Sequence, residues 1–255
     1  MRTLEVTFTP AEFAALRLRD LGQTVCVVFD VLRATSSIVT ALGNGAAAVV
    51  PVEDIPEALA LRKRAAEVLL AGERDGLRIQ SELTGGVAFD LGNSPREFTR
   101  EKVAGKTIAM TTTNGTRALR ACAGAQRVLI GSLLNLGAVA DYLSASEPEG
   151  LLLVCSGTFE EAAYEDVLGA GALCELVWPL YKDGHVADSA GMAHRLFEME
   201  RADLAGALSR SRNGRRLLSR PDLREDVAYC AELNRIPVLA EMDKSGTVRA
   251  TQVKT

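Results

Sequence analysis

Short apolar segments that break off into clusters of polar residues recur along residues 24–158 of this chain. The clusters span Asp30–Thr35, Gly72–Arg74, Thr111–Thr116, Gly131–Ser132 and Cys155–Thr158. Near-continuous apolar runs are typical of strands that are buried on both faces of a parallel sheet. Because ligands of open α/β sheets bind at the carboxyl ends of strands, these clusters are expected to meet at one edge. The sequence therefore predicts one site, rich in groups that suit a phosphate and a hard cation.

Strand and helix patterns alternate through this part of the chain. The predicted strands are Thr24–Phe29, Ala47–Val52, Val68–Ala71, Thr107–Met110, Val128–Ile130 and Leu151–Val154. Between them, helical spacing covers residues 36–42, 54–67, 116–121 and 134–143. By the right-handed crossover rule, this alternation predicts an α/β fold, a mostly parallel or mixed sheet with helices on both faces.

The remaining segments follow other patterns. Residues 75–92 predict a long loop, and the chain after Glu161 is mainly helical to about residue 233, which gives a helical C-terminal third. A last strand near residues 237–240 is expected to join the sheet edge. The expected breaks between the late helices are at Pro179, Gly184 and Asn213–Gly214. The length fits a single domain over residues 1–255, with two α/β lobes divided near residue 145 as the alternative.

Composition narrows the class of protein. The chain has 47% apolar residues, a net charge of −4 and five cysteines without a C-x-x-C pair, so neither a zinc site nor a disulfide framework is indicated. Its longest apolar stretches, Val25–Phe29 and Ala46–Val52, are far shorter than the roughly 20 residues that span a bilayer. The start, Met1–Val6, lacks the pattern of a secretion signal. We therefore expect a cytoplasmic protein without a membrane partner.

A basic run at Ser209–Arg220 is the one local concentration of positive charge. It has no interleaved aromatic residues, which nucleic-acid sites commonly use for stacking. The run is therefore predicted to be a solvated helix end or loop, and no nucleic-acid partner is expected.

Asp30 and Arg33 follow the first buried strand and are candidate catalytic residues. A carboxylate in that place is costly to bury unless a metal or an arginine compensates it, so Asp30 is a candidate ligand for a cation. Arg33 can bind phosphate or sulfonate oxygens with two N–H groups at once. Helix capping or a salt bridge for Asp30, and a surface ion pair for Arg33, are the structural alternatives.

Four further acids are candidates. Glu73 and Asp90 lie near glycines that let the backbone approach a ligand, and both are candidate metal ligands beside Asp30. Asp90 is equally suited to an Asx turn before Asn93. Glu165 and Asp166 are candidate catalytic residues that bind metal or activate water, although acids in the first turn of a helix are also favoured by the helix dipole.

Hydroxyl and amide groups in the same clusters are candidates for binding the substrate. Thr35 and Ser36 start a helix, where they either cap it or bind an anion. The segment after the strand at 107–110 places hydroxyl and N–H groups at a turn into a helix, with a well-capped turn as the alternative. The candidates in and beyond that segment are Thr111, Thr112, Thr113, Asn114, Gly115, Thr116, Ser132 and Asn135.

Several long motifs together resemble the 2-phosphosulfolactate phosphatase family. They are Val28–Ser36, Ala71–Arg74, Phe89–Pro95, Thr111–Thr116, Gly131–Asn135, Cys155–Thr158, Glu165–Gly171 and Asp226–Cys230, in the family's order along nearly the whole chain. The resemblance implies a fold peculiar to that family and a Mg²⁺-dependent acid phosphatase that converts 2-phosphosulfolactate into sulfolactate and phosphate, on a route to coenzyme M. Residues 160–164 depart from the family's pattern.

The residue types favour direct attack by a metal-activated water. Phosphatases that phosphorylate an Asp use Asp-x-Asp-x-Thr, and here Leu32 occupies the place of the second Asp. Cysteine phosphatases use C-x-x-x-x-x-R, and Glu161 stands where that arginine belongs after Cys155.

Other functions stay open from sequence alone. They are a phosphatase for another small 2-phospho acid, a non-catalytic module that binds a phosphorylated or sulfonated metabolite, and a nucleotide-dependent enzyme. The last lacks a Gly-x-Gly-x-x-Gly after the first strand. A monomer and a homodimer are both compatible with the sequence, and neither His185 nor His194 is assigned a role.

Overall fold

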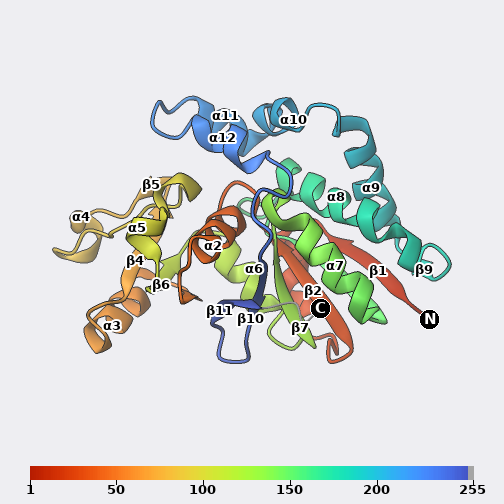
Figure 1. The fold of residues 1–255 in the computed structure, drawn as a ribbon, viewed down its shortest axis with the longest axis horizontal. Helices are drawn as coiled ribbons and strands as arrows, with labels where there is room; N and C mark the ends of the chain where they lie inside the picture. Colours follow the sequence, from red (N-terminus) through yellow and green to blue (C-terminus); the bar gives the residue numbers. More distant parts are fainter. Residues whose placement is uncertain (252–255) are drawn as a thin grey trace.

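A computed structural model describes residues 1–251, whose strands form one sheet in the order β5-β4-β6-β3-β11-β10-β7-β2-β8-β1-β9 (Figure 1). The strands are β1 (Thr3–Thr7), β2 (Thr24–Phe29), β3 (Ala48–Pro51), β4 (Leu69–Arg74), β5 (Leu77–Arg78), β6 (Thr107–Thr111), β7 (Arg127–Gly131), β8 (Gly150–Cys155), β9 (His185–Val186), β10 (Leu239–Met242) and β11 (Val248–Thr251). Every strand predicted between residues 24 and 155 is present. The sheet is mixed, as expected.

Helices cover both faces of this sheet, which confirms the predicted α/β architecture. They are α1 (Phe13–Leu16), α2 (Ala34–Gly43), α3 (Ile55–Arg64), α4 (Ser81–Thr84), α5 (Arg100–Val103), α6 (Gly115–Ala121), α7 (Leu136–Ser146), α8 (Tyr164–Tyr181), α9 (Asp188–Glu200), α10 (Leu204–Arg210), α11 (Arg212–Leu218) and α12 (Glu225–Cys230). Short 3-10 helices lie at Pro10–Glu12, Pro95–Glu97 and Leu133–Asn135. The last helices, α10 to α12, lie above the sheet in Figure 1. No helix of the described residues is long and apolar enough to cross a membrane.

β2 shows why the apolar runs form central strands. Val25, Val27 and Phe29 belong to the cluster that packs under α7 and α8. Cys26 and Val28 point to the other face and pack with residues of α2 and α6. Because successive side chains of a strand alternate between faces, a strand covered on both sides must be apolar at every position.

The parallel strands fall into two groups that a hairpin joins. β7, β2, β8 and β1 pair in parallel, and so do β3, β6 and β4. The antiparallel pair β10 and β11 lies between the groups, with β10 on β7 and β11 on β3. The expected edge position of the last strand is therefore wrong, because β11 supplies a second strand that closes the gap in the middle of the sheet.

Three further local predictions are corrected. Asn213 and Gly214 lie inside α11, which Ser211 caps by accepting a hydrogen bond from the Gly214 N–H, so the expected break at these two residues is wrong. α8 continues through Pro179 to Tyr181, since a proline close to a helix end removes only one internal hydrogen bond. The segment 75–92 contains β5 and α4 in place of a continuous loop, and β5 pairs antiparallel with β4 through the turn at Asp75 and Gly76. That turn becomes part of the site described below.

The polar clusters gather at one edge of the sheet, as the sequence predicts. Phe29 pairs with both Gly131 and Cys155, so the ends of β2, β7 and β8 are level. Gly72 pairs with Thr111, which levels β4 with β6 in the same way. Residues at the ends of β2, β7 and β8 can therefore contact residues at the ends of β4 and β6, although the β10–β11 hairpin lies between the two groups of strands.

Candidate functional site

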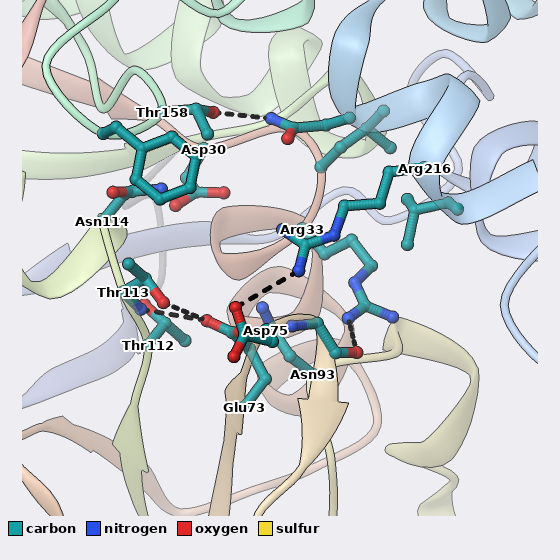
Figure 2. A pocket seen from close by; sticks show the side chains of 15 residues that line it. Asp30, Arg33, Glu73, Asp75, Asn93, Thr112, Thr113, Asn114, Thr158 and Arg216 are labelled. Carbon is teal, nitrogen blue, oxygen red and sulfur yellow. Dashed lines mark hydrogen bonds and ion pairs between the residues drawn. The ribbon is translucent and has the colours of Figure 1, made fainter. Parts of the chain in front are cut away.

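A pocket opens at this edge, with an empty volume of about 630 Å³ including its mouth (Figure 2). Its lining comes from the loop after β2 (Asp30, Leu32, Arg33), the β4 end and turn (Glu73, Asp75, Gly76), Asn93, the loop after β6 (Thr112, Thr113, Asn114), the loop after β8 (Thr158, Phe159) and α11 (Asn213, Arg216, Leu217).

Asp30 is fixed by the backbone on one side and faces the pocket on the other. Its Oδ1 accepts a hydrogen bond from the Ala34 N–H at 3.0 Å, and its own N–H donates to the Thr35 Oγ1 at 3.0 Å. Its Oδ2 lies so close to Gly115 that a Cβ on that glycine would approach it to 2.9 Å. Asp30 therefore accepts the first N–H of α2 from just outside the helix, which comes close to the capping alternative, while no hydrogen bond from the described residues reaches its second oxygen.

Burial raises the pKa of Asp30 to about 6, and the negative charges of Glu73 and Glu165 add to the rise. The ionised form is therefore held at a cost near neutral pH. A divalent cation next to the carboxylate would remove that cost, because an opposite charge favours the ionised form.

Glu73 is the second acid of the pocket. Its Oε1 accepts hydrogen bonds from the Thr113 N–H at 3.0 Å and the Thr113 hydroxyl at 2.9 Å. Its Oε2 accepts a hydrogen bond from the Gly76 N–H at 2.7 Å. A carboxylate offers about four acceptor positions, so one remains for a cation. These bonds join the β4–β5 turn to the loop after β6.

Two buried oxygen atoms in the loop after β6, the Thr112 Oγ1 and the Asn114 Oδ1, have no hydrogen-bond partner in the described part of the chain. Buried polar atoms without partners are uncommon in folded proteins and call for a ligand, water or ion. Both residues line the pocket beside Thr113. The segment 111–116 therefore contributes Thr112, Thr113 and Asn114 to the pocket directly.

Arg33 forms a buried ion pair in the wall of the pocket. Its Nη1 donates to the Asp226 Oδ2 at 2.8 Å, and its Nη2 donates to the Gly76 carbonyl oxygen at 2.9 Å. Asp226 also accepts a hydrogen bond from the Ser94 hydroxyl at 2.6 Å. The ion pair is therefore internal, in contrast to the surface pair considered from sequence. Asp226 was missed as a partner because it lies 193 residues away along the chain.

Glu165 and Asp166 lie behind the pocket lining. The two Asp166 oxygens accept hydrogen bonds from the Val31 N–H at 2.8 Å and the Gly157 N–H at 3.0 Å, which ties the loops after β2 and β8 together. Burial raises the pKa of Asp166 well above its usual range, and Asp30 and Glu165 raise it further. Burial also raises the pKa of Glu165, whose Oε1 accepts a hydrogen bond from Asn213 at 2.6 Å and whose Oε2 is buried without a partner.

Several predicted residues lie outside the pocket lining. Ser36 bonds to the Val31 carbonyl and to Ser132, and Asn135 holds backbone of β7 and Val238. Thr111 contacts Arg74 and Glu53, and the Thr116 hydroxyl donates to the Thr112 carbonyl. These side chains brace the loops. Thr35 and Gly115 likewise act on the site through Asp30.

Asp90, the third predicted metal ligand, is not brought into the pocket. Its carboxylate pairs with Arg62 and accepts a hydrogen bond from the Leu70 N–H at 2.7 Å. Asn93, three residues later, lines the pocket instead. Nearness to a glycine, the sequence signal used for Asp90, could not tell which of Asp90 and Asn93 lines the pocket.

The basic run at 209–220 forms a wall of the site, which corrects its prediction as a solvated helix end or loop. α11 presents Asn213, Arg216 and Leu217 to the pocket, and the Asn213 amide links the Thr158 hydroxyl to Glu165. Positive charge concentrated in a chain of negative net charge was the available signal, since anionic ligands attract such charge.

The acids of the pocket do not form a closed cage of metal ligands. Among the described residues, the group with three ligand atoms within 4.8 Å of one another is Glu175, His194 and Glu198, on α8 and α9. Arg201 and Arg195 already pair with the two carboxylates of that group. Mg²⁺ is commonly held by one or two carboxylates together with water and substrate phosphate, so Asp30 and Glu73 fit it.

Comparison with known proteins gives the family of this chain. The sequence profile of the 2-phosphosulpholactate phosphatase family matches residues 10–245. The chain belongs to this family. Members of the 2-phosphosulpholactate phosphatase family are phosphoric monoester hydrolases, so the chain is an enzyme of that class, as the sequence motifs indicated.

Similar proteins from bacteria carry the same description. The chain is 40% identical over 236 residues to a protein of Caldanaerobacter subterraneus subsp. tengcongensis, covering 92% of this chain and 93% of the other. It is 42% identical over 204 residues to a protein of Thermotoga petrophila, covering 80% and 82%, and 37% identical over 239 residues to one of Carboxydothermus hydrogenoformans, covering 93% and 92%. All three are described as probable 2-phosphosulfolactate phosphatases.

Proposed function

We propose that this enzyme hydrolyses 2-phosphosulfolactate to sulfolactate and phosphate with Mg²⁺ as cofactor, in the cytoplasm and on a route to coenzyme M. The names of its relatives support the substrate. The observation that carries the proposal is Asp30. One oxygen is held by backbone, the other faces the pocket, and burial raises its pKa to about 6.

Asp30 and Glu73 are the residues that would hold Mg²⁺. Glu73 keeps one acceptor position beyond its bonds to Thr113 and Gly76, and within residues 1–251 no hydrogen bond is donated to the Asp30 Oδ2. A bound Mg²⁺ offsets the charge of a phosphate and lowers the pKa of a coordinated water. Asp90 lies outside the pocket lining and pairs with Arg62, so it takes no part in this site.

The loop after β6 is suited to orient the phosphate group. The Thr112 Oγ1 is a buried hydroxyl without a partner and can donate to a nonbridging phosphate oxygen. The Asn114 side chain can offer its NH₂ group when its amide is turned, since its Oδ1 has no partner to lose. Holding the ester in one orientation lowers the barrier to attack by water.

In this proposal the nucleophile is water, because the residues around Asp30 and Cys155 do not suit a phosphoenzyme mechanism. Leu32 lines the pocket at the place where a phosphoenzyme mechanism would need its second Asp, and an apolar side chain cannot transfer a proton. Burial raises the pKa of the Cys155 thiol well above its usual range, so Cys155 is not a thiolate at neutral pH. Acid quench during turnover should trap no hydroxylamine-sensitive phosphoenzyme, and a trapped phosphoenzyme would overturn direct attack.

The test of substrate and metal uses the wild-type protein. Phosphate release is measured from 2-phosphosulfolactate and from phospholactate, after treatment with EDTA and after Mg²⁺ is restored. The proposal expects hydrolysis of the sulfonate that disappears with EDTA and returns with Mg²⁺. Faster hydrolysis of phospholactate would favour another small 2-phospho acid as the substrate. No hydrolysis of either compound, by folded protein that binds them, would contradict the proposal in favour of a binding module.

A further inference from the structure

Three guanidinium groups gather around Gly76, in the turn between β4 and β5. The Arg33 Nη2 donates to the Gly76 carbonyl oxygen at 2.9 Å. A Cβ placed on Gly76 would lie 4.0 Å from the Arg216 Cζ and 4.0 Å from the Arg220 Nη1. Gly76 itself adopts a φ of +78°, a conformation that favours glycine. Positive charge is thus concentrated on one side of the pocket.

The protein compensates these three charges unequally. Arg33 is committed to the buried carboxylate of Asp226 at 2.8 Å. Arg216 has a single ion pair, 3.5 Å from Asp75, whose side chain is 89% exposed. An exposed pair at that distance contributes little, so most of the charge of Arg216 remains available to a ligand.

Arg220 is the least compensated of the three. No carboxylate of residues 1–251 lies within 4.0 Å of its guanidinium, and its Nη1 is buried without a hydrogen-bond partner. Leaving a buried charged donor unsatisfied is unfavourable. A ligand that brings anionic oxygens to this place would satisfy it.

These arginines lie across the pocket from Asp30. Figure 2 shows Asp30, Thr113 and Asn114 on one side and Arg216 with Arg33 on the other. The pocket continues into an adjoining hollow that shares Arg33, Gly76 and Asn93 with it, and Arg220 lines that hollow. A small molecule with anionic groups at both ends would place one group on each side.

We propose that Arg216 and Arg220 form a second anion subsite, which binds the sulfonate or carboxylate of a phosphate monoester whose phosphate lies beside Asp30. This rests on the proposed function for the phosphate side of the pocket. Guanidinium groups match both anions because their N–H donors form a planar fork. The subsite makes the enzyme selective for phosphate esters that carry a second strong acid on a nearby carbon.

The test measures selectivity in matched variants. Arg216→Gln and Arg220→Gln are compared with Arg215→Gln, which makes the same charge change at an exposed position of α11. The readout is kcat/KM for 2-phosphosulfolactate divided by kcat/KM for phenyl phosphate, which lacks the second acid. Loss of one charge-assisted bond should lower this ratio about 10- to 100-fold in the first two variants. The Arg215→Gln ratio should match the wild type.

Phospholactate separates the two sources of the anion. If its hydrolysis is as sensitive to Arg216→Gln as that of 2-phosphosulfolactate, the carboxylate occupies the subsite; if it is insensitive, the sulfonate does. Either result supports the proposal. An unchanged selectivity ratio in both Arg216→Gln and Arg220→Gln would overturn it.

Binding of sulfolactate, measured by calorimetry, distinguishes failure of the subsite from failure of the phosphatase assignment. If the protein hydrolyses none of the esters but binds sulfolactate, and Arg216→Gln weakens this binding while Arg215→Gln does not, the subsite stands without the proposed reaction. Binding that is absent in the wild type, or equal in all variants, would overturn the subsite.

Discussion

Replacing Asp30 by Asn should stabilise the metal-free protein while removing its activity. Burial and the nearby charges of Glu73 and Glu165 raise the pKa of Asp30 from 3.8 to about 6 in the folded protein. The folded state therefore binds the Asp30 proton more tightly than the unfolded chain does. The stabilisation from that proton is complete below pH 3.8 and is lost as the pH rises through about 6.

The size of the effect follows from this shift. Above pH 7 the ionised carboxylate destabilises the folded state by about 3 kcal/mol relative to an uncharged group. Asparagine carries no charge, and its Oδ1 can still accept the hydrogen bond from the Ala34 N–H. In EDTA at pH 8, Asp30→Asn should therefore raise the melting temperature by about 6 to 12 °C.

The assay is thermal and urea-induced unfolding between pH 4 and pH 8, in EDTA. The advantage of Asp30→Asn should be near zero at the lowest pH and grow through pH 6. Asp141→Asn, on an exposed position of α7, is the matched control and should show no such trend. Equal stability of Asp30→Asn and wild type across the whole range would refute the reasoning about the buried charge.

Three further changes test other parts of the site. Arg33→Lys should destabilise the protein by about 3 kcal/mol and lower activity, because Asp226 loses its close partner; unfolding and kinetics measure both. Gly115→Ala should lower kcat strongly and destabilise the fold by about 1 to 3 kcal/mol, because its Cβ would approach the Asp30 Oδ2 to 2.9 Å and the buried Ala34 Cβ to 2.8 Å; unaltered kcat would contradict this contact. Cys155→Ala should retain hydrolysis, because burial raises the pKa of the Cys155 thiol. Loss of turnover in a folded variant would indicate that the thiol takes part in catalysis.

Local sequence patterns were sufficient for the central strands. The run at Thr24–Phe29 forms β2 with the predicted bounds, because a strand covered on both faces must be apolar at every position. The place of β10 in the sheet could not be predicted in this way. The place of β10 depends on its pairing with β11, which follows it closely, and with β7, which lies far away along the chain, and a local sequence pattern does not specify such a distant partner.

The site likewise contains some residues that local sequence predicts and others that only the packing of distant segments brings in. Asp30 was predictable because it follows directly on the buried strand β2, and Glu73 because it lies near the end of β4, so both reach the sheet edge. The partner of Arg33 was not, because Asp226 reaches it from 193 residues away through the packing of α12. Arg216 was overlooked for a similar reason, since a basic helix that covers a pocket has the same local pattern as one that faces solvent.

The most direct test of the central claim is the hydrolysis of 2-phosphosulfolactate by wild type and Asp30→Asn side by side in Mg²⁺, with sulfolactate binding measured on the same samples. The account predicts a loss of at least about 100-fold in kcat for the variant, because one of the two carboxylates that would hold Mg²⁺ is gone, while sulfolactate still binds. A variant that releases phosphate as fast as the wild type would show that the reaction does not depend on Asp30 and that the site lies elsewhere.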